Sequence, residues 1–298
     1  MHDGLFSERA EKHAQLHSIF VNHARNREVM RFINRAYKPV EGGLHGRGNI
    51  SAVIGPSRTG KTYGVQQFVS DYAEYISNNG VKVPIVVVDC PVEGGVRAVL
   101  ESFTDALGIT VSPRTTNANL MQMILREVVR AEVEFVIIDE AQEMFPEKNK
   151  RLLSFARSFL RKLLNLRRFN IVCIGLPETY SIIAEDSQLI GRGGLPYKSV
   201  QPYDWNDPDD RKNFRVLCQK FDEELPFESS GLVELDYSSR LFNASLGSIG
   251  LLKNLILAAG ESALNEDSPR IERRHFAEVY DERKRPGQTF NPFRHEIS

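Results

Sequence analysis

The chain has 298 residues, of which 41% are hydrophobic and 26% are charged, and its formal net charge is −1 at pH 7. This composition excludes a disordered or fibrous protein, and the near-zero charge means that any nucleic acid must be bound by a local basic patch. The cysteines lack metal-ligand spacing and the first residues lack the apolar core of a signal peptide, so we expect a cytoplasmic protein without a zinc site or membrane anchor.

The first 48 residues are predicted to form an N-terminal helical adaptor. Basic residues are interleaved with apolar ones at helical spacing between Arg25 and Lys38. The glycine-rich stretch EGGLHGRGN, residues 41–49, follows them and predicts a flexible connection to the next element.

Residues 49–203 are predicted to form an α/β nucleotide-binding subdomain, because short apolar strands alternate there with helical segments. The strands are expected at 50–54, 83–89, 135–139 and 171–175, with a short one at 198–201. The helices are expected at 61–77, 96–107, 120–130 and 152–166. This order predicts a three-layer fold around a parallel sheet.

Beyond Pro202 the pattern becomes helical. The acidic link YDWNDPDDRKNF introduces a small helical lid at 204–284, with helices expected at 209–221, 230–243, 248–264 and 270–283. Residues 285–298 carry two prolines and several basic residues, and we expect them to form a flexible C-terminal tail.

The stretch GPSRTGKT, residues 55–62, follows the strand ISAVI and precedes a helix, as a phosphate-binding loop requires. Glycines let the backbone amides converge on a phosphate, a lysine neutralises phosphate oxygens, and a threonine ligates Mg²⁺. The alternative is a glycine turn between core elements. We predict ATP contacts from Gly55, Pro56, Ser57, Arg58, Thr59, Gly60, Lys61, Thr62 and Tyr63.

The second motif, FVIIDEAQEM, is acidic. It places two carboxylates at the end of a buried strand, where a negative charge is energetically costly without a cation nearby. We predict that Asp139 helps Thr62 to hold Mg²⁺, and that Glu140 is the base that deprotonates the attacking water. The alternative is a strand that merely ends in solvated acids.

Arg192 is flanked by Gly191, Gly193 and Gly194 after the strand at 171–175. An arginine on a glycine loop suits a catalytic finger that enters a neighbouring subunit's site, which predicts a homo-oligomer. An ordinary surface turn is the alternative.

In these motifs the chain resembles the AAA+ ATPases of transposons in the TniB and TnsC group, including those of CRISPR-associated transposons, and more distantly the phage protein MuB. The likeness runs through the phosphate loop, IIDEAQ, IGLPETY, DSQLIGR and LGSIGLLKNLILAAGESAL, over about residues 48–280. It implies a P-loop AAA+ core with a helical lid. It also implies ATP-bound subunits that form a ring or helical filament on duplex DNA and recruit a transposase.

The resemblance also assigns residues. Gly55, Gly60, Lys61 and Thr62 match Walker A, Asp139 and Glu140 match Walker B, and Arg192 matches the family's arginine. Lys253 or Arg240 is implied as the second sensor of nucleotide. Leu176 stands where the family often has threonine, so we expect slow hydrolysis.

Cations that could hold DNA phosphates cluster between residues 144 and 170. The alternative for this run is a solvated helix face or a subunit contact. We predict duplex DNA contacts, without strong sequence preference, from Arg97, Arg114, Thr116, Lys148, Lys150 and Arg151.

The leading hypothesis is therefore an ATPase that regulates DNA transposition, together with a transposase and a target-selection protein. The alternative is a P-loop signalling or remodelling ATPase that acts on a protein partner without DNA. Stimulation of the ATPase by DNA separates the two.

Overall fold

A computed structural model describes residues 2–37, 48–72, 74–77, 80–191 and 194–296. The chain divides into two compact units. The α/β unit is Arg25–Val200, and the helical unit combines Met1–Ala24 with Gln201–Ser298. The backbone therefore passes between the units twice, at residues 24–25 and 200–201.

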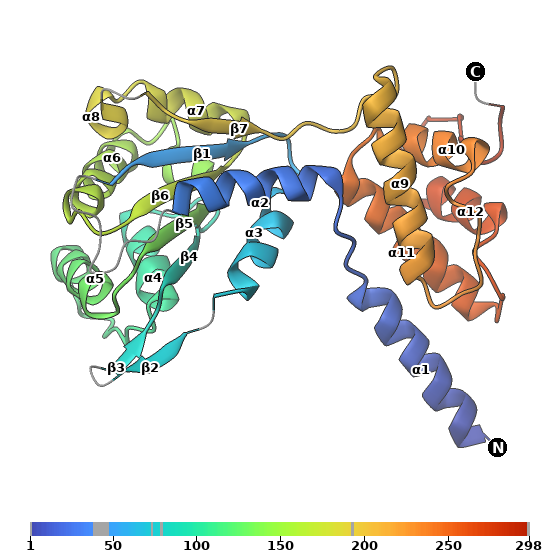
Figure 1. Cartoon of the computed structure of the whole chain (residues 1–298), viewed down its shortest axis with the longest axis horizontal. Coiled ribbons are helices and arrows are strands. Elements are labelled where there is room, and N and C mark those ends of the chain that lie inside the picture. The colour runs from blue at the N-terminus through green and yellow to red at the C-terminus, as the bar shows by residue number, and fades with distance from the viewer. Residues whose placement is uncertain (1, 38–47, 73, 78–79, 192–193, 297–298) are drawn as a thin grey trace. The chain divides into compact units, whose positions relative to one another are not determined.

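The α/β unit is built on a five-stranded sheet (Figure 1). Its order is β4 (Ile85–Asp89), β5 (Phe135–Asp139), β6 (Asn170–Gly175), β1 (Ile50–Ile54) and β7 (Tyr197–Ser199). All four pairings are parallel. This confirms the predicted α/β fold with a parallel sheet, and it brings the carboxyl ends of the strands to one edge.

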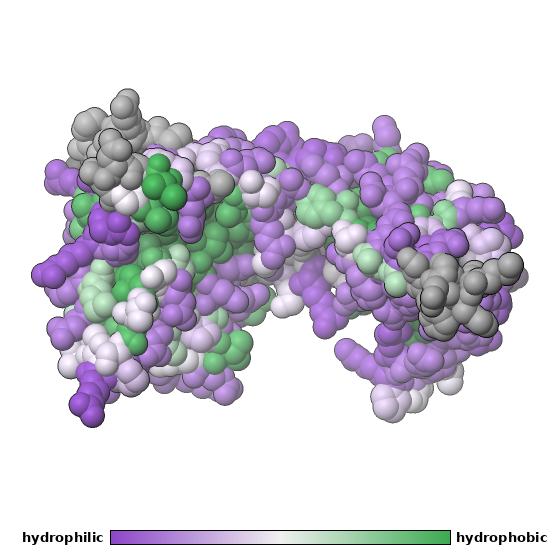
Figure 2. All heavy atoms as spheres, turned by 90° about the horizontal axis from the view of Figure 1, so that it is seen from below, coloured by the Kyte–Doolittle hydropathy of each residue, from purple (hydrophilic) through white to green (hydrophobic). Residues whose placement is uncertain are grey.

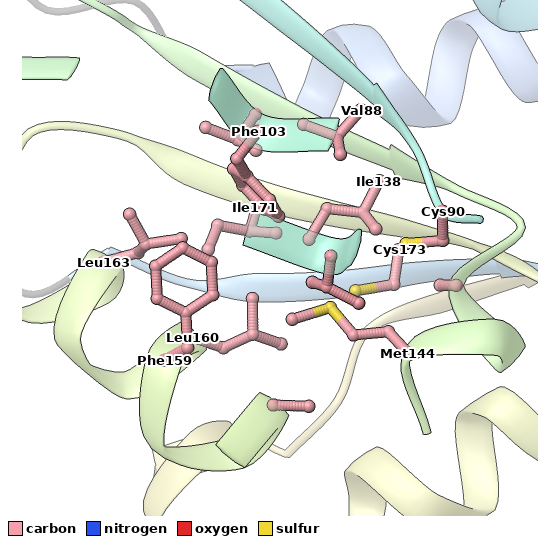
Figure 3. Packing of buried hydrophobic residues seen from close by; sticks show 14 of the residues in the cluster. Val88, Cys90, Phe103, Ile138, Met144, Phe159, Leu160, Leu163, Ile171 and Cys173 are labelled. Carbon is pink, nitrogen blue, oxygen red and sulfur yellow. The ribbon is translucent and has the colours of Figure 1, made fainter. Parts of the chain in front are cut away.

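Both faces of the sheet are buried, so successive side chains along a strand enter different cores. Ile171 and Cys173 face one core and Val172 and Ile174 the other. The first core is covered by α4 (Val96–Ala106), α5 (Asn117–Arg130) and α6 (Lys150–Asn165). The second is covered by α2 (Ala24–Tyr37) and α3 (Lys61–Ser70). Figure 3 shows the first core. Phe103 of α4 and Phe159 of α6 pack edge to face there, with ring centroids 4.9 Å apart.

Three short elements complete the first face near the carboxyl ends of the strands. They are the 3₁₀ turn η1 (Ala141–Met144), α7 (Pro177–Ala184) and α8 (Ser187–Ile190). On the other face α2 packs closely against α3, since a Cβ on Gly64 would lie 2.8 Å from both Asn26 Oδ1 and Val29 Cγ1.

The largest difference from the predicted helices of the α/β unit lies after the phosphate loop. The helix predicted at 61–77 ends at Ser70, and the antiparallel ribbon of β2 (Tyr75–Ser77) and β3 (Gly80–Lys82) follows. Tyr75 and Ile76 favour a strand when a partner is at hand. The Ile76 side chain of this ribbon is 85% exposed. Such exposure of an apolar residue differs from most of the surface seen in Figure 2, where hydrophilic residues dominate.

The helical unit contains α1 (His2–Ser18), α9 (Pro208–Glu224), α10 (Leu235–Ser245), α11 (Ile249–Asn265) and α12 (Arg273–Arg283). No single helix in the described part of the chain is long and apolar enough to cross a membrane, although α10 and α11, bent by 113°, pass a length and composition test as a pair.

The predicted N-terminal adaptor is divided between the units. Leu16, Ile19 and Val21 are buried in the core of the helical unit, whereas α2 belongs to the α/β unit. A Cβ on Gly260 of α11 would lie 2.8 Å from Leu16, so α1 packs tightly there. The two helices separate because their apolar faces fit different cores.

The predicted flexible tail is also corrected, because residues 291–293 pack on the helical unit. Phe293 is 2% exposed and stacks on Phe276 of α12 with ring centroids 5.2 Å apart. The fully buried Asn291 donates from Nδ2 to the Ala277 carbonyl at 2.8 Å. The buried Arg240 guanidinium donates to the carbonyls of Pro292 and His295. Apolar burial and these bonds offset the entropy of ordering the segment.

We predict that Phe293→Ala lowers the free energy of unfolding of the helical unit by about 3 kcal/mol, because it removes a buried aromatic ring. Trp205 is the chain's single tryptophan and lies in this unit, so its fluorescence in a urea titration reports the transition. Phe290→Ala is the matched control, since Phe290 is 43% exposed. Equal midpoints for both variants would mean that the segment is not packed.

Candidate functional site

The loop between β1 and α3 has a conformation that requires glycine at both ends. A Cβ on Gly55 would collide with the backbone carbonyl of Val200. The Val200 amide in turn donates a hydrogen bond to the Ile54 carbonyl at 2.7 Å. Gly60 has a φ of 87°, in the left-handed region that glycine adopts without strain. The Thr59 hydroxyl donates to the Pro56 carbonyl at 2.9 Å and closes the loop.

The Lys61 ammonium lies inside this loop. Its Nζ donates to the carbonyls of Gly55 at 2.8 Å and Pro56 at 2.7 Å, and the residue is 8% exposed. Burial lowers the pKa of Lys61, and the negative charges of Glu140 and Asp139 oppose that shift. The lysine of the first motif therefore lies within electrostatic reach of both acids of the second.

Asp139 ends β5 and is only 6% exposed. Burial raises its pKa, while hydrogen bonds from the Thr62 hydroxyl and the Glu140 amide act in the opposite direction. The Glu140 amide donates to Asp139 Oδ1 at 2.9 Å. The structure thus brings together Thr62 and Asp139, the two predicted magnesium ligands.

These two oxygen donors fit a magnesium ion that takes its remaining ligands from phosphate and water. Over the residues that the structure describes, no group of three or more His, Cys, Asp and Glu side chains could form an all-protein metal site. A pair of hard oxygen donors beside a phosphate loop is the arrangement expected for a metal that arrives with its nucleotide.

Glu140 lies next to Asp139 in a left-handed conformation, with a φ of 48°, and its side chain is exposed. Gln142 of η1 donates from Nε2 to Glu140 Oε2, and its Oε1 accepts a bond from the Leu176 amide at 3.2 Å. Sequence reasoning gave Gln142 no role. Its place in IIDEAQ, two residues after Glu140, is the signal that could have identified it.

Both candidates for a second sensor have partners inside the helical unit. Lys253 donates to the Ile19 carbonyl at 3.0 Å, and burial lowers its pKa. Arg240 is 6% exposed and pairs with Asp236 as well as with the C-terminal segment. Arg240 thus helps to hold the C-terminal segment, and the nucleotide role of either residue stays a prediction. Arg192 lies outside the described residues.

The residues predicted to hold DNA fall into two groups. Arg97 pairs with Glu101 at 2.8 Å and donates to the Thr115 carbonyl at 2.7 Å, while Thr116 caps α5 by accepting a bond from the Asn119 amide. These two residues hold the turn before α5. The second group is exposed and forms no ion pair within the described ranges: Arg114, Lys148, Lys150 and Arg151.

Two other arginines of the basic run hold the α7–α8 corner. Arg157 donates to the Ile182 carbonyl at 2.9 Å and pairs with Glu185, and both Arg157 and Arg161 lie 3.9 Å from an Asp186 oxygen. This part of the run therefore braces the fold, a role that neither the DNA-binding prediction nor its alternative included.

We predict that Asp139→Asn stabilises the nucleotide-free protein and raises its Tm by about 2–4 °C, the size of shift that about 1 kcal/mol produces in a unit of this length. The folded state binds a proton at Asp139 more tightly than the unfolded chain does, because its pKa is raised. Stability therefore falls as pH rises through the range between the two pKa values, and asparagine removes that loss.

The control is Asp89→Asn, because Asp89 pairs with Asp139 in the sheet register but is exposed. Differential scanning calorimetry without nucleotide measures both variants. A Tm for Asp139→Asn at or below that of the unsubstituted protein would contradict the unfavourable burial of this charge.

A family model described as bacterial TniB protein matches residues 15–195, more than half of the chain. No curated protein sequence matches the chain.

Solved structures match over most of the chain at low identity. Cdc6p from Pyrobaculum aerophilum is 13% identical with a TM-score of 0.64, over 90% of this chain and 70% of that one. The ORC1 protein of Aeropyrum pernix is 16% identical with a TM-score of 0.65, over 88% of this chain and 66% of that one. The ADP form of the Aeropyrum pernix ORC2 protein is 15% identical with a TM-score of 0.61, over 89% of this chain and 70% of that one. The fold expected from the resemblance is confirmed, and the chain belongs to the TniB family of AAA+ ATPases.

Proposed function

We propose that the protein is an ATP-dependent regulator of DNA transposition. In this proposal it oligomerises on duplex DNA when ATP is bound, recruits a transposase together with a target-selection protein, and is reset by hydrolysis in the cytoplasm. Membership of the TniB family supports the link to transposition. The observation that carries the ATP-dependent part is the meeting, at one edge of the sheet, of Lys61, Thr62, Asp139 and Glu140.

Each of these residues has a proposed role in hydrolysis. The loop amides and Lys61 bind the phosphates, and this requires the ammonium to exchange the Gly55 and Pro56 carbonyls for phosphate oxygens. Thr62 and Asp139 hold Mg²⁺, which supplies charge neutralisation for the phosphates when bound. Glu140 accepts a proton from the water that attacks the terminal phosphorus. Leu176 offers no polar side chain after β6, so we propose that turnover is slow.

Assembly follows from the same proposal. The arginine at position 192 acts on the nucleotide of a neighbouring copy, an assignment that rests on the sequence alone. A triphosphate bound between two copies would then couple ATP binding to assembly into a ring or a helical filament.

DNA binding is proposed for the exposed cations at the start of α6. Lys148, Lys150 and Arg151 surround the N-terminus of a 16-residue helix whose first turn holds no acidic residue. That end of a helix already carries a partial positive charge, so the three cations repel it and one another. An anionic ligand relieves the repulsion, and DNA offers a row of phosphates. The solved Aeropyrum pernix ORC1 protein is in complex with DNA, which supports this part.

We predict that Glu140→Gln keeps ATP affinity and lowers kcat by about 100-fold or more, because the glutamine amide cannot accept the proton from water. The variant should remain on duplex DNA after ATP is added, since reset requires hydrolysis. Phosphate release, binding of a fluorescent ATP analogue and DNA retention on a biosensor measure the three properties. Normal turnover would remove Glu140 from the mechanism.

Lys61→Ala is the companion variant. It should lose nucleotide binding and, with it, ATP-dependent DNA binding. If Lys61→Ala binds ATP like the unsubstituted protein, the phosphate-loop assignment is wrong.

We predict that replacing Lys148, Lys150 and Arg151 together by alanine makes the negative slope of log K against log salt for duplex DNA shallower by about 2.7, since each lost phosphate contact contributes about 0.9 to its magnitude. Fluorescence anisotropy with ATP and Mg²⁺ at several salt concentrations measures it. The control removes the same charge from exposed positions of the helical unit: Arg211, Lys212 and Arg285.

An equal loss in both triple variants would mean that net charge, and not this surface, determines affinity. An unsubstituted protein whose ATPase and assembly respond to a protein partner but not to DNA would favour the signalling or remodelling function.

A further inference from the structure

Gln142 joins two elements of the nucleotide site through one side-chain amide. Its Nε2 donates to Glu140, which follows β5, and its Oε1 accepts from the amide of Leu176, which follows β6. The two partners follow neighbouring strands that are paired in parallel. One planar amide therefore fixes the Glu140 carboxylate relative to the end of the next strand.

The space around this amide is tightly defined. A Cβ on Gly175 would lie 2.5 Å from Gln142 Oε1 and 2.6 Å from Thr179 Oγ1, so a larger residue at the end of β6 would displace these side-chain oxygens. Gly175 has no positive φ, so this close approach, and not backbone conformation, favours glycine there. The absence of a Cβ at position 175 leaves room for the Gln142 amide beside the end of β6.

A second polar group borders the same space without taking part in the contact. Thr179 of α7 is fully buried, and its hydroxyl has no hydrogen-bond partner in the part of the chain that the structure describes. It offers a matched position at which a polar atom can be removed while the shape is kept.

The contact to Glu140 is more than a support for η1. A glutamine that only anchored the turn would be satisfied by the Leu176 bond and the burial of its stem. Here the amide also places a donor on one carboxylate oxygen of Glu140, which is otherwise exposed. A carboxylate held on one oxygen keeps the other oxygen in a defined direction to accept a proton.

We propose that Gln142 is a positioning residue for ATP hydrolysis, which orients the Glu140 carboxylate and ties it to the end of β6. The inference rests on the proposed role of Glu140 as the base. Gln142 acts through Glu140 and does not contact the nucleotide, so its loss changes turnover and not ATP affinity.

The substitution Gln142→Glu separates the two contacts. It keeps the length of the side chain and an oxygen that accepts from the Leu176 amide, but it replaces the donor to Glu140 by a second carboxylate. We expect kcat to fall by about 10- to 100-fold, the cost of a misplaced catalytic group, with ATP affinity unchanged within about twofold. Thr179→Val, the control in the same space, should keep both kcat and ATP affinity.

A double-mutant cycle then tests whether Gln142 acts through Glu140. Single-turnover hydrolysis of labelled ATP is measured for Gln142→Glu, Glu140→Gln and the double variant. We expect the double variant to be no slower than Glu140→Gln alone. A full additional loss in the double variant, or a normal kcat for Gln142→Glu beside an impaired Glu140→Gln, would overturn the positioning role alone. Normal turnover of Glu140→Gln would overturn the base assignment and this inference with it.

Discussion

The parallel alignment of the strand carboxyl ends is the constraint on which the nucleotide site depends. β1 delivers the phosphate loop, β5 delivers Asp139 and Glu140, and β6 ends at Gly175 in register with Ile54 of β1. Parallel pairing needs both faces of the sheet to be covered, and the two cores provide that cover. Apolar packing on the two faces of the sheet thus sets the distances between the phosphate loop and the two carboxylates.

The site keeps ionisable groups where burial disfavours their charge. The pKa of Asp139 is raised and that of Lys61 is lowered, in both cases mainly by burial. The Lys61 ammonium donates to backbone carbonyls of its own loop. In the proposed function, a triphosphate and its metal would supply opposite charges that offset the burial of these two residues, so affinity for the ligand would be gained at the expense of folding stability.

The motifs that could be predicted are those contained in one contiguous stretch. The phosphate loop and IIDEAQ each carry their strand, turn and charged residues within about ten positions, and the strands at 50–54 and 135–139 were predicted with the right bounds. One of the two partners of Gln142, the Leu176 amide, lies 34 residues away, and nothing local indicates it. The division of the N-terminal helices and the docking of Phe293 depend likewise on which core accepts an apolar face. α3 ends at Ser70, and Tyr75 and Ile76 lie instead in a strand whose partner, β3, follows in the chain.

The backbone passes between the two units at residues 24–25 and 200–201, and the α/β side of each passage adjoins the phosphate loop or the helix after it. Val200 packs on Gly55, and Asn26 packs on Gly64. A residue larger than glycine at position 55 or 64 would therefore disturb the chain next to one of these two connections as well as the loop itself.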